Sequence, residues 1–125
     1  MDDLAYYNGN FMPVNEVKIS PLDRGFLFAD GVYEVVPVYN NNPFFFREHL
    51  NRLYRSLSSI RLDPYITKDE LKSCIEELIK QTRHSHQIVY VQITRGVANR
   101  NHAFPKSTRP TILSLIHISE PTRRS

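Results

Sequence analysis

Two helical patterns, set between strand-like segments, constrain the fold of this chain more than any other feature. From about Glu48 to Ile60, apolar residues recur at helical spacing and form one stripe. Thr67–Glu70 is a capping box, which predicts the start of a second amphipathic helix. With strands before and after the helices, the expected order β-β-β-β-α-α-β-β predicts an α+β fold, a mostly antiparallel sheet with two packed helices.

Turn residues set the boundaries of the expected strands. Asn8-Gly9 occupies the two hairpin positions that require positive φ, which predicts a hairpin over Tyr6–Met12. Gly31 opens a strand over Val32–Tyr39, and its β-branched run indicates burial on both faces. The other expected strands are Phe44–Phe46, Ile88–Thr94 and a segment that begins at Thr111.

Composition excludes several functional classes. The chain has 125 residues, 41% hydrophobic and 23% charged, so we expect one soluble domain. Its net charge of +3 comes from scattered lysines and arginines, whereas nucleic-acid binders cluster theirs. No stretch approaches the roughly 20 apolar residues of a membrane helix, and Asp2 and Asp3 do not fit a signal peptide, so a cytoplasmic location is expected. Cys74 is alone, which excludes an internal disulfide, and its helical pattern predicts a small buried hydrophobe.

The segment Asp23–Glu34 carries the strongest functional signal. It places two glycines, four charged residues and the phenol of Tyr33 beside a strand. A plain hairpin needs only a turn pair, so this density of polar groups points to chemistry. The alternative is a polar loop whose charges satisfy backbone groups.

Further segments accompany this one, in order along the chain: Tyr7–Gly9, Glu16–Ile19, Glu48–Leu53, Gln92–Gly96 and Arg100–Pro105. Together they resemble the N-terminal part of the class IV (fold type IV) pyridoxal-phosphate aminotransferases, most closely those that act on D-amino acids. The resemblance implies pyridoxal 5'-phosphate as cofactor, amino and 2-oxo acids as substrates, and a homodimer. It gives no role to nucleic acid or a membrane.

Arg52 is the expected ligand of the cofactor phosphate, because the resemblance places an arginine of the family there. A guanidinium stays charged and bonds a dianion through parallel N–H groups. The alternative is a solvated helix arginine. For His49, three residues earlier, we expect a structural role, with orientation of a neighbouring group as the alternative.

Tyr33, Arg100 and His102 are the expected pocket for the substrate α-carboxylate. In the D-amino acid enzymes the corresponding arginine and histidine reach across from the partner subunit. The Arg-x-His spacing suits a loop on which alternate side chains point the same way. The branched-chain L-transaminases and aminodeoxychorismate lyases lack this pair. The alternative is an exposed loop arginine and histidine.

None of the lysines fits the position of the lysine that carries the cofactor in this family; they are Lys18, Lys68, Lys72, Lys80 and Lys106. In the family that lysine, and a glutamate that pairs with the pyridine nitrogen, come later in the chain. We therefore expect the N-terminal domain of a D-amino acid transaminase, inactive alone. The alternatives are an aminodeoxychorismate lyase, a branched-chain or amine transaminase, and a non-catalytic α+β interaction module.

Residues 113–125 are expected not to belong to the natural gene. Leu113–Arg123 is identical, residue for residue, to one reading frame of a widely used transposase sequencing adapter. A match of eleven consecutive residues is not expected by chance. We expect the domain to cover residues 1–112, and a chain ending at Ile112 to behave the same, although the apolar residues 113–116 could prolong the last strand.

Overall fold

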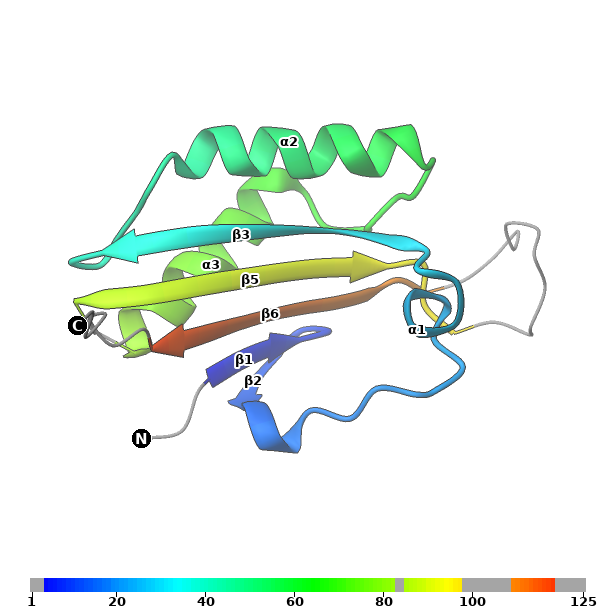
Figure 1. Cartoon of the computed structure of the whole chain (residues 1–125), viewed down its shortest axis with the longest axis horizontal. Coiled ribbons are helices and arrows are strands. Elements are labelled where there is room, and N and C mark those ends of the chain that lie inside the picture. The colour runs from blue at the N-terminus through cyan, green and yellow to red at the C-terminus, as the bar shows by residue number, and fades with distance from the viewer. Residues whose placement is uncertain (1–3, 83–84, 98–108, 119–125) are drawn as a thin grey trace, which may run out of the picture.

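A six-stranded antiparallel sheet with helices on one face forms the fold, so the predicted α+β class is confirmed (Figure 1). The computed structural model describes residues 4–82, 85–97 and 109–118. The strand order is β2-β1-β6-β5-β3-β4, and every neighbouring pair is antiparallel. No helix in these ranges is long and apolar enough to cross a membrane.

The predicted N-terminal hairpin is confirmed. Strands β1 (Leu4–Tyr7) and β2 (Asn10–Pro13) pair across a two-residue turn. Asn8 and Gly9 have φ of 45° and 99°, the positive values that such a turn requires. A short 3-10 helix η1 (Val14–Glu16) follows, and an extended segment then leads to the five-residue helix α1 (Arg24–Phe28) at one end of the sheet (Figure 1).

The predicted strand Phe44–Phe46 is wrong. Strand β3 (Gly31–Tyr39) turns through two asparagines with positive φ into β4 (Asn42–Pro43), which pairs with only two residues of β3. Phe45 adopts a left-handed φ of 52°, which ends the extended conformation. Phe46 then begins helix α2, and its buried side chain belongs to the hydrophobic core.

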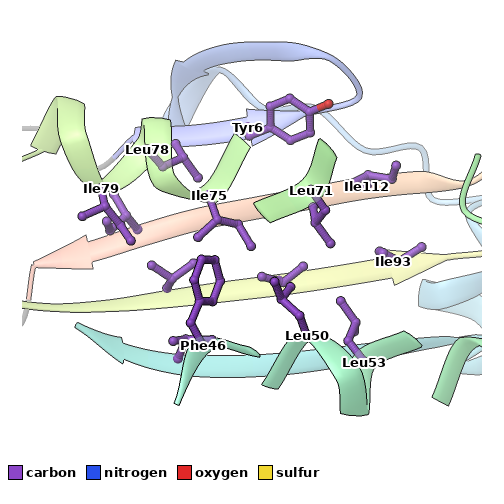
Figure 2. Packing of buried hydrophobic residues seen from close by; sticks show 14 of the residues in the cluster. Tyr6, Phe46, Leu50, Leu53, Leu71, Ile75, Leu78, Ile79, Ile93 and Ile112 are labelled. Atoms are coloured by element: carbon purple, nitrogen blue, oxygen red, sulfur yellow. The ribbon is translucent and has the colours of Figure 1, made fainter. Parts of the chain in front are cut away.

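Both predicted helices are present. Helix α2 (Phe46–Ser59) packs over β3, and α3 (Lys68–Thr82) over β1 and β6. The capping box is formed in both directions. The Glu70 amide donates to Thr67 Oγ1 at 3.0 Å, and the Thr67 amide to Glu70 Oε1 at 2.8 Å. Figure 2 shows the apolar stripes of the two helices meeting over the strands, and Cys74 lies half-buried against this core.

The last two strands complete the sheet. Strand β5 (His86–Thr94) pairs with β3, and β6 (Thr111–Ile118) lies between β5 and β1. Six of the eight β6 residues follow Ile112, and Ser114 and Ile116 are fully buried. A chain that ends at Ile112 would lack these six residues, so whether it behaves the same depends on what β6 contributes to the sheet. The alternation of apolar residues beyond Ile112 suits a strand that is covered on one face.

The second face of the sheet is open at β3. Glu34, Val36 and Val38 are buried on the helix side, whereas the Tyr33 residue is 70% exposed. Val35 and Pro37 are only half-buried. The predicted burial of this strand on both faces is therefore wrong for the described residues, because α2 and α3 lie on the same side of the sheet (Figure 1).

Candidate active site

Glu34 is the one charged residue in the row of β3 side chains that faces the helices. Its neighbours in that row, Val36 and Val38, belong to the hydrophobic core, and Glu34 itself is only 6% exposed. A carboxylate at such a depth requires charged or hydrogen-bonding partners. Two side chains of α2 supply them.

Arg52 and His49 both bond the Glu34 carboxylate. Arg52 donates from Nε to Oε2 at 2.7 Å and from Nη2 to Oε1 at 2.9 Å. His49 Nδ1 lies 2.8 Å from Oε1. The two residues are three apart on α2, beside the stripe that contacts the sheet, so the helix presents both to the same carboxylate.

The electrostatics of this cluster favour the charged forms. Hydrogen bonds from Arg52 lower the pKa of Glu34 below its ordinary value of 4.5, burial opposes the shift, and His49 adds to it. The same bonds from Glu34 raise the pKa of Arg52 above its already high value. The carboxylate and the guanidinium are therefore both ionised at neutral pH.

Glu34 should stabilise the fold only above the acid range. Because its pKa is lower in the folded chain than the ordinary 4.5, its contribution is complete above about pH 4.5. That contribution is lost as the pH falls through the folded pKa. We expect Glu34→Gln to lower the free energy of unfolding by on the order of 1 kcal/mol near pH 7. The loss is small because solvent screens the charge of the exposed Arg52 side chain.

Urea unfolding of both chains at several pH values checks this expectation. The loss of stability in Glu34→Gln should be present near pH 7 and should shrink as the pH falls below about pH 4.5. A difference that stays the same or grows as the pH falls below about 4.5 would contradict the assignment of the charged form to Glu34.

The position of the Arg52 guanidinium is compatible with the anion-binding role that the resemblance implies for it. The side chain is 61% exposed although its guanidinium is held by Glu34. A guanidinium has five N–H donors, and Glu34 takes two of them, so donors on the opposite edge are directed away from Glu34. A fixed, exposed fork of this kind matches the oxygens of a phosphate group.

Tyr33 lies on the opposite face of β3 from Glu34, because successive strand residues alternate. The structure therefore does not place Tyr33 in contact with Arg52. Arg100 and His102 lie outside the described residues. The cross-strand neighbour of Tyr33 on β5 is Gln92, which is exposed on the same open face.

The four described lysines lie elsewhere. Lys68 donates to Asn51 at 2.6 Å, and Lys72 pairs with Glu76 at 2.9 Å on α3. Lys18 is exposed in the segment after η1, and Lys80 is exposed in the last turn of α3. Lys106 lies outside the described residues.

Asp23 has a structural role, which the sequence left open. Its carboxylate accepts hydrogen bonds from the hydroxyls of Thr94 and Thr111, each at 2.6 Å, and from the Gly25 amide at 2.8 Å. Gly25 lies so close to Thr94 that a Cβ atom would overlap its side chain. Asp23 thus fastens α1 to the ends of β5 and β6.

Asp30 is a second structural carboxylate. Arg24 and Arg95 donate from Nε to its Oδ2 at 2.7 and 2.8 Å, and all three residues are buried. Arg95 also donates to the carbonyls of Ile60 and Arg61 after α2. Three of the four charges in Asp23–Glu34 therefore hold the fold, and only Glu34 faces an exposed cation.

Glu34 is the functional candidate that the sequence analysis did not single out. The sequence signal for Glu34 is its position, since Glu34 alternates along the strand in step with Val36 and Val38. An acidic residue among buried valines needs a cationic partner from a neighbouring element.

Comparison with known proteins identifies the family. The family model described as amino-transferase class IV matches residues 31–125. The chain belongs to the class IV aminotransferases. D-alanine aminotransferase of Staphylococcus haemolyticus is 42% identical over 111 residues, which are 88% of this chain and 39% of that protein. D-alanine aminotransferase of Bacillus licheniformis is 38% identical over 106 residues, 85% of this chain and 38% of that protein.

Solved structures of class IV aminotransferases share the fold. The branched-chain amino acid aminotransferase from Escherichia coli aligns with a TM-score of 0.87 at 18% identity, over 95% of this chain and 42% of that chain. The branched-chain aminotransferase from Thermoproteus uzoniensis with norvaline gives a TM-score of 0.83 at 19% identity, over 94% and 41% of the two chains. This class IV chain thus spans about two fifths of the proteins it matches.

Proposed function

We propose that this chain is the N-terminal domain of a pyridoxal-phosphate-dependent D-amino acid transaminase, which moves an amino group between a D-amino acid such as D-alanine and a 2-oxo acid such as 2-oxoglutarate. The observation that carries the proposal is an exposed guanidinium held by a buried carboxylate, at Arg52 and Glu34, in a chain 42% identical to a D-alanine aminotransferase.

Arg52 would hold the cofactor phosphate through the donors that Glu34 leaves free. The bound cofactor supplies the electron sink that makes the substrate α-proton removable. The contribution of this domain is then to bind and orient. Its geometry supports that division, since Arg52 is exposed while its partner Glu34 is buried.

Tyr33, Arg100 and His102 would bind the substrate carboxylate, with Arg100 and His102 supplied by the partner subunit of a homodimer. The exposure of the Tyr33 residue, 70%, supports a group that meets a ligand or another subunit. A phenol and two nitrogen donors give a carboxylate several charge-assisted bonds. The cytoplasm is the proposed location.

A longer protein that carries this domain and the region that follows it in the relatives should form pyruvate from D-alanine and 2-oxoglutarate. The 125-residue chain alone, given excess pyridoxal phosphate, should form none above the free-cofactor background, because the lysine that carries the cofactor in the family corresponds to none of its five lysines. Pyruvate release measures both.

Each alternative function has its own outcome in this assay. Turnover of L-leucine in place of D-alanine would assign a branched-chain transaminase, and pyruvate release from aminodeoxychorismate would assign the lyase. Pyridoxal phosphate neither bound nor used by the longer protein would leave an interaction module. Turnover by the 125-residue chain, abolished by replacing one lysine, would show that the reactive amine lies in this domain.

We also propose that residues 113–125 derive from adapter sequence. The support is the identity of Leu113–Arg123 with the adapter reading frame. A genomic amplicon that encodes residues 119–122 in frame would overturn this origin. The strand geometry of residues 113–118 is independent of how those residues arose.

A further inference from the structure

Two side chains of α2, Arg52 and His49, bond the Glu34 carboxylate at 2.7–2.9 Å. We infer that Glu34 is a positioning residue, which orients the Arg52 guanidinium and the His49 imidazole so that both bind the phosphate of one phosphomonoester, an inference that rests on the proposed function. Neither Glu34 nor His49 was expected to serve ligand binding.

The orientation of Arg52 follows from its two bonds to one carboxylate. Nε and Nη2 lie on one edge of the guanidinium plane, and both point at Glu34. A planar group held at two points on one edge cannot rotate about its long axis without breaking both bonds. The donors of the opposite edge therefore keep a fixed direction, although the side chain is mostly exposed.

The orientation of His49 follows from the chemistry of its partner. An ionised carboxylate only accepts hydrogen bonds, so His49 Nδ1 carries the proton that is shared with Glu34. The opposite ring nitrogen, Nε2, has no partner in the described part of the chain. Since the His49 side chain is 19% exposed, Nε2 is available to a phosphate oxygen or its hydroxyl.

A competing role for Glu34 predicts the opposite sign. If Glu34 merely neutralised Arg52, its removal would release a cation and bring a phosphate closer to a more positive surface. Phosphate would then bind more tightly to Glu34→Gln. If Glu34 positions Arg52 and His49, the same change weakens binding, because a glutamine has an NH2 group in place of one accepting oxygen and so leaves a donor of Arg52 or His49 without a partner.

Titration of the chain with pyridoxine 5'-phosphate, followed by NMR shifts of Arg52 and His49, tests the inference. This probe has the ring and the phosphate but no aldehyde, so it cannot condense with surface lysines. We expect Glu34→Gln to bind it about tenfold or more weakly than wild type, the usual loss for a charged hydrogen bond. Glu48→Gln, the same charge change at an exposed site in the first turn of α2, should stay within about twofold.

The variant Glu34→Asp provides a second test of the inference in case the glutamine variant does not fold. It keeps the charge but shortens the reach by one methylene, so positioning predicts weaker binding and simple electrostatics predicts no weakening. Wild-type affinity in Glu34→Asp, or unchanged or tighter binding in Glu34→Gln relative to Glu48→Gln, would overturn the inference and leave the proposed function intact.

The phosphate site itself is tested by a second matched pair. Arg52→Gln should bind the probe at least about tenfold more weakly than Arg55→Gln, since Arg55 is an exposed arginine on the same helix. If the two variants bind alike, or wild type prefers pyridoxine to its phosphate, the assignment of Arg52 fails and the proposed function fails with it.

Discussion

A chain that ends at Ile112 should not fold. Strand β6 pairs with β5 on one side and β1 on the other, and six of its eight residues follow Ile112. Without them the sheet divides into the hairpin β1–β2 and the group β5-β3-β4. An isolated hairpin is marginally stable at best, and the core also loses Ile116, which is fully buried.

Circular dichroism and urea unfolding measure this effect directly. The chain ending at Ile112 should show no cooperative transition, whereas a chain ending at Ile118 keeps all of β6 and serves as the control. Equal urea midpoints for the two would show that β6 does not hold the sheet together.

Replacing Asp30 by asparagine should be the most damaging single substitution at the α1 end of the sheet. The change leaves the buried guanidiniums of Arg24 and Arg95 without the carboxylate that both contact. Breaking a buried ion pair by removing one partner typically costs about 3–5 kcal/mol. That is a large share of the roughly 5–15 kcal/mol that stabilises a domain.

The pH dependence of the Asp30 contribution has a definite sign. Burial raises the pKa of Asp30, but hydrogen bonds from Arg95 and Arg24 outweigh it and bring the pKa below its ordinary 3.8. The stabilisation is therefore present above about pH 3.8 and is lost as the pH falls through the folded pKa.

Urea unfolding at pH 7 compares Asp30→Asn with Asp69→Asn, an exposed aspartate in the first turn of α3. The control should change stability by no more than about 0.5 kcal/mol. A loss below about 1 kcal/mol in Asp30→Asn would mean that the arginines do not depend on this carboxylate.

Local signals predicted much of the fold. The Asn8-Gly9 turn, the capping box at Thr67 and the apolar stripes of both helices act within a few residues, and the structure contains each of them. The strand predicted at Phe44–Phe46 is absent from the structure. Its aromatic residues favour a strand, but the tight turn before them and the left-handed Phe45 direct the chain into α2.

The site was predictable only in part, because its contacts join distant residues. Arg52 could be named from its place in a motif, whereas its bond to Glu34, 18 positions earlier, depends on how α2 crosses β3. The charges near Asp23 and Asp30 resemble functional groups in the sequence. Their partners, Thr111 and Arg95, are 88 and 65 positions away, so only the structure identifies them as fold-holding carboxylates.

The place of β6 also sets the order in which this domain can be assembled during synthesis. The hairpin β1–β2 is made first, yet the strand that joins it to the rest of the sheet is the last of the six to be made. The Ile112 amide reaches Asn8 across 104 positions. Such distant pairing slows folding, so the nascent hairpin has no neighbouring strand to join until β6 emerges.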